Sequence, residues 1–239
     1  MTAALASAGA APLAPLVAGV PVRAALVDLD GTMVDTLGDF LVALGGMLRE
    51  LGLGEVTPEQ VAQRVGKGSE HLVAQVLRLH LPAQQADALQ ARALRVYQQH
   101  YTLANGRHSE LFPGVIEGLR RLRDAGLALA CVTNKPGVHA RELLERKGLL
   151  EFFSEVVGGD AFERKKPDPL PLLRTCERLG QPPARTLMVG DSQNDAAAAA
   201  AAGCPAVLAT YGYNHGEPIR STPALAYFDR LDQLPLQPA

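Results

Sequence analysis

The chain has 239 residues, enough for one large domain or for a domain that carries an insertion. Hydrophobic residues make up 47%, which can fill a substantial core, and a formal net charge of -2 with 5% aromatic residues argues against a nucleic-acid partner. The three cysteines lie far apart without metal-ligand spacing, so we expect neither a disulfide framework nor a structural zinc site.

The N-terminal segment over residues 1–20 is rich in Ala, Pro and Gly, and it is expected to be a flexible tail. It has no basic start, and prolines interrupt its apolar stretch, so we do not expect a signal peptide. No later run reaches the roughly 20 apolar residues that a membrane span needs. These features predict a soluble, cytoplasmic protein.

An apolar run beginning at residue 24 predicts a buried strand over 24–28, which ends in Asp28 and is followed by Asp30. Side chains two positions apart on a strand point the same way, so both carboxylates are expected on one side of the strand's end. Two carboxylates about 4 Å apart repel by ~4 kcal/mol at an effective dielectric near 20. Such a pair needs a cation or a shared proton to persist.

Residues 38–105 have a different pattern, typical of helices. Apolar residues fall at helical spacing in three stretches, around Phe40, Leu72 and Leu89, with loops expected near 52–54 and 66–68. This block therefore reads as a helical insertion directly after the first strand.

From about residue 108 the pattern alternates between helices and apolar strands. Helices are expected over 114–125, 137–147, 169–179 and 195–203, and strands over 127–133, 154–159, 185–191 and 206–210, the last being the final strand. Alternation of this kind predicts an α/β fold with a doubly wound parallel sheet covered on both faces. The core domain would comprise 21–37 and 106–239, with 38–105 as a helical cap.

Ligands of such sheets bind beyond the carboxyl ends of the strands. The polar residues that follow the predicted strands are Asp28, Asp30, Thr133, Asn134, Lys166, Asp191 and Asp195. Carboxylates suit a hard cation such as Mg²⁺, while a hydroxyl, an amide and a lysine suit a phosphoryl group. Together they favour metal-assisted phosphoryl transfer with an aspartate nucleophile.

Four sequence motifs resemble those of the haloacid dehalogenase superfamily. They are DLDGTMVDT from Asp28, CVTNKP with Thr133, RKKPDPLPLL with Lys166, and VGDSQNDAAAA with Asp191. The insertion resembles the C1-type cap of that superfamily. The TNKP, KPDPLPLL and YGYN stretches are similar to those of the phosphoglycolate phosphatase family.

The resemblance implies a role for each carboxylate. Asp28 would attack phosphorus and contact the metal, and Asp30 would act as general acid and base while its backbone carbonyl binds the metal. Asp191 would be a metal ligand, although it could instead cap the following helix. Asp195 would bind the metal or support the residues that do, although its place in a first helical turn alone could explain it.

The phosphate-binding residues implied by the resemblance are Thr133, Asn134 and Lys166. Thr133 could also be a helix N-cap, and Lys166 would stabilise the phosphoryl charge and Asp28. Lys135 is not expected to take part. In the cap, Arg64 and Lys67 are candidate contacts for an anionic substrate, because Lys67 lies between two glycines in a predicted loop, although it could equally be a solvated charge.

The resemblance thus implies a Mg²⁺-dependent phosphomonoesterase that converts 2-phosphoglycolate to glycolate and phosphate. Its partner would be a small anionic phosphomonoester, and the protein would be a monomer or a homodimer. The leading alternative is a phosphatase for another small substrate such as a sugar phosphate. A phosphosugar mutase, a phosphonate hydrolase with a cap lysine and a non-catalytic binding protein also remain open.

Overall fold

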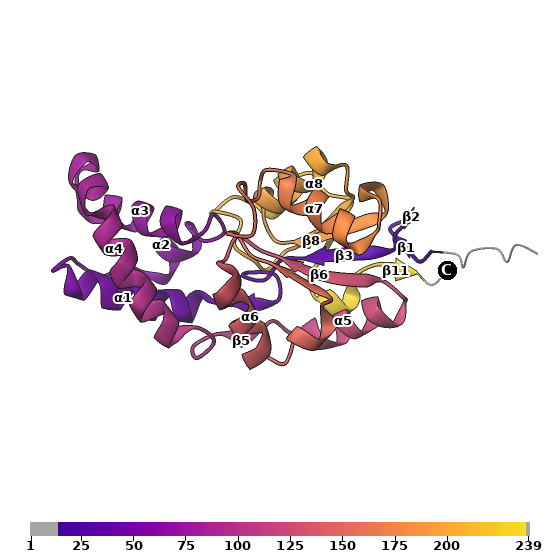
Figure 1. Ribbon diagram of the computed structural model, residues 1–239, viewed down its shortest axis with the longest axis horizontal. Helices are drawn as coiled ribbons and strands as arrows, with labels where there is room; N and C mark the ends of the chain where they lie inside the picture. The colour runs from indigo at the N-terminus through magenta and orange to yellow at the C-terminus, as the bar shows by residue number, and fades with distance from the viewer. Residues whose placement is uncertain (1–13, 238–239) are drawn as a thin grey trace, which may run out of the picture.

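The computed structural model describes residues 14–237 and forms two bodies, an α/β core and a block of helices beside it (Figure 1). The core is built on a six-stranded sheet with the order β10-β9-β8-β3-β6-β7, in which every neighbouring pair is parallel. The strands are β3 (Ala24–Val27), β6 (Ala128–Val132), β7 (Glu155–Val157), β8 (Thr186–Gly190), β9 (Ala206–Ala209) and β10 (Ala226–Phe228). The predicted doubly wound fold is therefore confirmed.

Side chains of β3 alternate between the two faces of the sheet, and helices cover both. Ala25 and Val27 pack into one apolar cluster, whereas Leu26 packs into the other. The first cluster includes residues of α5 (Val115–Asp124) and α6 (Gly137–Arg146), and the second includes residues of α7 (Leu170–Leu179) and α8 (Gln193–Ala202). With both faces covered, a strand has to be apolar throughout, as β3 is.

The helical block has an apolar core of its own. It comprises α1 (Leu37–Glu50), α2 (Pro58–Ala62), α3 (Ser69–His80) and α4 (Ala83–Ala104). The rings of Phe40, Tyr97 and Tyr101 stack along its interior, with neighbouring centroids 5.5 and 5.4 Å apart. The short helix α2 lies between the two predicted loops of the helical block, and it is held by a capping box between Thr57 and Gln60.

Two segments of the chain connect the helical block to the core, and they form a short antiparallel pair of strands. The entering strand β4 (Val34–Asp35) pairs antiparallel with the leaving strand β5 (Glu110–Leu111). The buried carboxylate of Asp39 accepts hydrogen bonds from the backbone N–H groups of Gly106 (2.8 Å) and His108 (2.7 Å). The start of α1 is thereby tied to the chain that leaves the block.

The ends of the chain differ from the prediction. Of the expected tail over 1–20, residues 1–13 lie outside the described residues, but β1 (Leu16–Val17) and β2 (Val20–Pro21) form a small sheet with β11 (Leu236–Gln237). Val17 is fully buried there, which explains why this part is structured. The strand over 206–210 is not the last, because β10 and β11 follow it. None of the helices in residues 14–237 is long and apolar enough to cross a membrane.

Candidate active site

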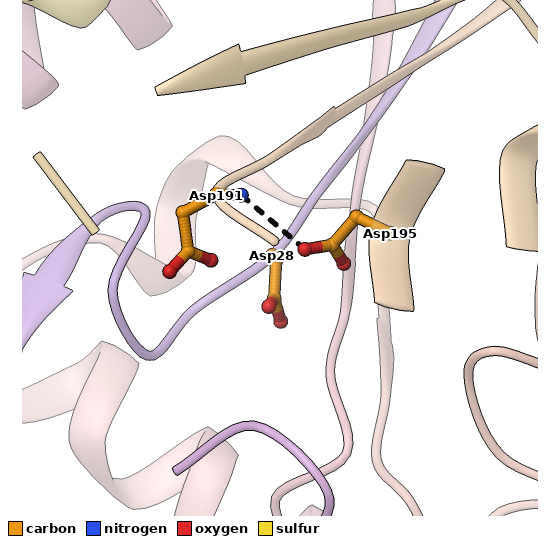
Figure 2. Close-up of side chains that lie close together, drawn as sticks. All are labelled: Asp28, Asp191 and Asp195. Atoms are coloured by element: carbon orange, nitrogen blue, oxygen red, sulfur yellow. Dashed lines mark hydrogen bonds between the residues drawn. The ribbon is translucent and has the colours of Figure 1, made fainter. Parts of the chain in front are cut away.

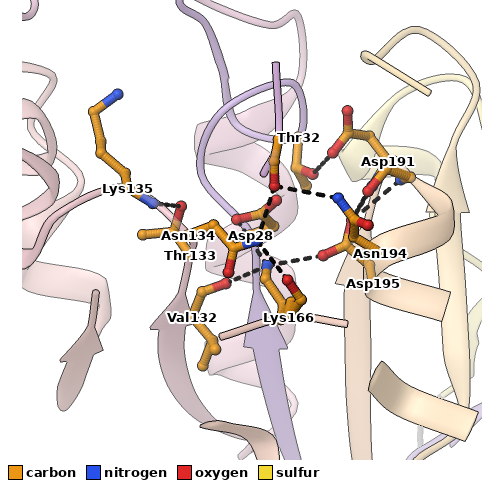
Figure 3. A network of polar contacts seen from close by, with 12 residues as sticks. Asp28, Thr32, Val132, Thr133, Asn134, Lys135, Lys166, Asp191, Asn194 and Asp195 are labelled. Carbon is orange, nitrogen blue, oxygen red and sulfur yellow. Dashed lines mark hydrogen bonds and ion pairs between the residues drawn. The ribbon is translucent and has the colours of Figure 1, made fainter. Parts of the chain in front are cut away.

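The carboxyl ends of three central strands bring the predicted site residues together. Asp28 follows β3, Thr133 follows β6 and Asp191 follows β8, and all three are buried. Lys166, from the loop between β7 and α7, lies among them (Figure 3). The expectation that polar strand ends converge is therefore met, because parallel strands end at one edge.

Asp28 is a buried carboxylate with one oxygen that accepts no hydrogen bond within the described residues. Its Oδ1 lies 3.0 Å from Lys166 Nζ but accepts no hydrogen bond from the described residues. Burial raises the pKa of Asp28, and the Lys166 ammonium lowers it. Burial has the larger effect, and the pKa is raised to about 6. A buried, incompletely paired oxygen of this kind is costly unless a ligand satisfies it.

Lys166 has two hydrogen-bond acceptors and a third oxygen at ion-pair distance. Its Nζ lies 2.6 Å from the Val132 carbonyl oxygen, 2.8 Å from Asp195 Oδ1 and 3.0 Å from Asp28 Oδ1. Burial alone would lower the pKa of Lys166, but the Asp195 and Asp28 carboxylates outweigh it and hold the pKa above its ordinary value. The ammonium is thus a fixed positive charge beside Asp28.

Asp191 is clamped by neighbours from two loops. Its Oδ1 accepts from the Thr32 hydroxyl (3.0 Å) and its Oδ2 from the Tyr213 backbone N–H (2.6 Å). A Cβ on either Gly31 or Gly212 would collide with Asp191, so only glycine fits at these positions. Burial and the nearby Asp195 and Asp28 carboxylates raise the pKa of Asp191 well above its usual range.

Three buried carboxylates lie close enough to share a cation. Asp28, Asp191 and Asp195 each place an oxygen within 4.8 Å of the others (Figure 2). The Asp28 oxygen that accepts no hydrogen bond, together with the nearby Asp191 carboxylate, fits a hard ion such as Mg²⁺. Their mutual repulsion favours binding of a cation between them.

Asp195 already has protein partners for both oxygens. Its Oδ1 accepts from Lys166, and its Oδ2 accepts from the N–H groups of Asp191 (3.2 Å) and Ser192 (3.1 Å) and from the Ser192 hydroxyl (2.8 Å). Ser192, rather than Asp191, is the N-cap of α8, which corrects the capping alternative for Asp191. Asp195 is therefore built to hold Lys166 and the turn that presents Asp191.

Asp30 makes an ion pair that the sequence did not suggest. Lys135 Nζ lies 2.7 Å from Asp30 Oδ1, and the Lys135 side chain is only 2% exposed. Lys135 was not expected to take part in the site. Its only signal was its position, since it follows Thr133 and Asn134 after β6.

Asn134 reaches toward the helical block. Its Nδ2 donates to the carbonyl oxygens of Gly66 (2.9 Å) and Lys166 (2.8 Å). Asn194 Nδ2 also donates to the Gly66 carbonyl, at 3.2 Å. The N-cap of α6 is Pro136, so Thr133 is not a helix cap, and the predicted phosphate contacts of Thr133 and Asn134 remain predictions.

A cavity lies between the strand ends and the helical block. Its polar side is formed by residues of the core, namely Asp28, Asp30, Thr133, Asn134 and Lys135. Its apolar side is formed by residues of the helical block, namely Phe40, Val65, Gly66, Gly68, Ser69, Leu72 and Tyr101. Arg64 and Lys67 are not among these lining residues. Arg64 Nη1 instead donates to the Gln60 carbonyl at 2.7 Å, and the predicted substrate contacts of both residues stay predictions.

Two further residues of the site were missed. The Tyr213 hydroxyl donates to Asp35 of β4, so Tyr213 links the Asp191 turn to the chain entering the helical block. Thr32 orients Asp191 from the loop after β3. Both belong to stretches noted in the sequence, DGT and YGYN, but their contacts span 178 and 159 residues along the chain.

Comparisons with known proteins agree with this geometry. A family model described as haloacid dehalogenase-like hydrolase matches residues 25–209. A phosphoglycolate phosphatase of Thiobacillus denitrificans is 42% identical over 84% of this chain and 88% of its own, and a plasmid-encoded one of Cupriavidus necator is 42% identical over 90% and 93%. The crystal structure of a predicted phosphoglycolate phosphatase from Haemophilus somnus superposes with a TM-score of 0.83 at 33% identity, covering 88% of this chain and 95% of that one.

Proposed function

The chain belongs to the haloacid dehalogenase-like hydrolase family, and from that premise we propose that it hydrolyses 2-phosphoglycolate to glycolate and phosphate, with Mg²⁺. The single observation that carries the chemistry is Asp28, a buried carboxylate that accepts no hydrogen bond at Oδ1 and faces the cavity beside a fixed ammonium. A carboxylate with a free oxygen and a neighbouring cation is suited to nucleophilic attack on phosphorus.

The reaction then has two steps. An Asp28 oxygen attacks phosphorus, the ester bond to the glycolate oxygen breaks, and Asp30 gives that oxygen its proton. Water next attacks the phosphorus of the aspartyl-phosphate, Asp30 takes the proton of that water, and Asp28 is regenerated as phosphate leaves. Lys166 balances the charge of Asp28 throughout, and Thr133 and Asn134 contact the phosphoryl oxygens.

Asp28, Asp191 and the backbone carbonyl of Asp30 would hold the metal ion, with Asp195 orienting both Lys166 and the Asp191 turn. The ion would supply positive charge to the phosphoryl oxygens. This assignment is supported by the geometry of the carboxylates, since Asp28, Asp191 and Asp195 each place an oxygen within 4.8 Å of the others.

The helical block would act as a cap over the cavity. It has its own apolar core, it is joined to the α/β core through the paired strands β4 and β5, and its loop at Gly66 contacts both Asn134 and Asn194. A cap of this kind excludes bulk water during attack by Asp28 and readmits a water molecule for hydrolysis.

The substrate assignment is supported by the relatives from Thiobacillus denitrificans and Cupriavidus necator, whose names give phosphoglycolate as their substrate. The test is phosphate release from a panel of monoesters with Mg²⁺, using wild type, Asp28→Asn and the exposed control Asp124→Asn. We expect 2-phosphoglycolate to lead in kcat/KM, the Asp28 variant to lose at least about 1,000-fold in kcat, and the control to keep its activity.

Two outcomes would redirect the assignment. A sugar phosphate with the highest kcat/KM would keep the mechanism and replace the substrate. No phosphate release, together with isomerisation of a sugar phosphate in the presence of a sugar bisphosphate, would favour a phosphosugar mutase. Full activity of Asp28→Asn would refute the nucleophile.

A further inference from the structure

Lys135 is a buried cation in the wall of the cavity. Within the described residues its ammonium has one hydrogen-bond acceptor, Asp30 Oδ1 at 2.7 Å, and it lies 5.0 Å from the ring centroids of both Phe40 and Tyr101. Attraction to a ring face uses the charge of an ammonium rather than its N–H donors. An ammonium has three donors, so Lys135 can bind a further acceptor without leaving Asp30.

The other nearby cations are not available in the same way. Lys166 donates to two acceptors, lies at ion-pair distance from Asp28 and points into the strand ends, with the Lys135 side chain directed away from it (Figure 3). Arg64 and Lys67 do not line the cavity. Of the residues that do, Lys135 is the one with a positive charge.

The position of Lys135 relative to Asp30 sets what it can reach. In the proposed reaction Asp30 protonates the leaving oxygen, so that oxygen lies beside the Asp30 carboxylate. The carboxylate carbon of glycolate is two bonds from that oxygen. A group so close to the leaving oxygen comes within reach of an ammonium already bound to Asp30.

We propose that Lys135 binds the carboxylate of the substrate and thereby selects phosphomonoesters whose leaving group carries an anionic group two bonds from the ester oxygen. This inference rests on the proposed function. The apolar walls formed by Phe40, Leu72 and Tyr101 keep water from the ion pair, which strengthens it relative to one in solvent. Lys135 is thus the specificity-determining residue at the far end of the substrate from Asp28.

The test compares two esters of similar size, 2-phosphoglycolate and ethyl phosphate, which lacks the carboxylate. The quantity measured is the ratio of their kcat/KM values, because a loss caused by disturbing Asp30 affects both esters and cancels. Lys135→Met should lower this ratio by about 10- to 100-fold, the range expected for a charge-assisted hydrogen bond. Lys135→Arg, which keeps the charge, should lose less.

Lys147→Met is the matched control, since Lys147 follows the opposite end of α6, and it should leave the ratio unchanged. Equal losses for both esters in Lys135→Met would overturn the proposal, because Lys135 would then act only through Asp30. If that variant fails to fold, the test uses wild type with three esters. A positive charge in the cavity wall requires kcat/KM to fall from 2-phosphoglycolate through ethyl phosphate to O-phosphoethanolamine. Equal kcat/KM values for the three esters would overturn the inference. Wild type that releases phosphate from none of these esters would refute the proposed function itself.

Discussion

At the scale of single residues, the site combines buried carboxylates with one fixed ammonium. Lys166 balances Asp28 and Asp195, while Asp191 has only neutral donors, Thr32 and the Tyr213 backbone. Removing one partner of a buried ion pair leaves an uncompensated charge, which is costly. The arrangement therefore favours binding of a cation beside Asp191.

The raised pKa of Asp28 has a consequence for stability in the absence of divalent cations. Burial raises this pKa from 3.8 to about 6, so the native state binds the proton more tightly than the unfolded chain does. Stability from this group is present at low pH and is lost as pH rises through the interval from about 4 to 6. The shift of about two units corresponds to roughly 1–3 kcal/mol.

Asp28→Asn should therefore stabilise the metal-free protein at pH 7.5 by roughly 1–3 kcal/mol, and by about half as much at pH 5, which is the middle of that interval. Urea denaturation at the two pH values in the presence of EDTA measures this. Saturating Mg²⁺ should raise the stability of wild type more than that of the variant, because a bound ion stabilises only the state that binds it. Equal urea midpoints for the two proteins at pH 7.5 would contradict the assignment of Asp28 as a buried charged group.

At the scale of elements, helix α1 is fixed to the core through its first turn. Asp39 accepts from two backbone N–H groups of the leaving chain, and Gly38 packs against the His108 carbonyl, where a Cβ would collide. Farther along the same helix, a Cβ on Gly45 would meet nothing within 4 Å. The two glycines therefore serve different purposes although both lie in one helix.

Gly38→Ala should lower the free energy of unfolding by roughly 1–3 kcal/mol, because the added methyl group forces the two connecting strands apart. Gly45→Ala should raise it by about 0.5–1 kcal/mol, since alanine is the better helix former. Urea denaturation of both variants, side by side, provides the measurement. Similar changes in the two would mean that the connection at Gly38 is loose enough to absorb a methyl group.

At the scale of the whole molecule, the cap loop is held to the core at one carbonyl. Gly66 oxygen accepts from Asn134 and from Asn194, and Asn194 also contacts His215 Nε2 at 3.2 Å. Burial and the nearby Lys67 lower the pKa of His215, which favours the neutral ring that can accept this bond. These contacts join the cap to the chain that follows β6 and to the first turn of α8.

Asn194→Ala should weaken cap closure and lower kcat/KM for 2-phosphoglycolate by about 10-fold, while stability changes by less than about 1 kcal/mol. Steady-state kinetics and a thermal melt measure the two effects. The neighbouring exposed Gln193→Ala is the control and should change neither. If kcat/KM is unchanged in Asn194→Ala, closure does not depend on this contact.

The amino-acid sequence by itself determined the fold class and which strand-end residues lie together. Apolar strands separated by amphipathic helices require a parallel sheet, and the polar residue after each strand then has to lie at one edge, so Asp28, Thr133 and Asp191 could be placed together. This part of the prediction depends on local sequence, because each strand and the polar residue after it lie within a few positions of one another.

The tertiary structure alone decided which partners these residues have. Lys135 meets Asp30 across 105 residues, Tyr213 meets Asp191 across 22, and the contacts of Asn134 with Gly66 depend on how the cap lies on the core. The short strands β10 and β11 also lack a periodic pattern. They form because a neighbouring strand supplies backbone hydrogen-bond partners and a buried face. Long-range pairing of this kind depends on packing between distant segments, which hydrophobic periodicity along the chain does not encode.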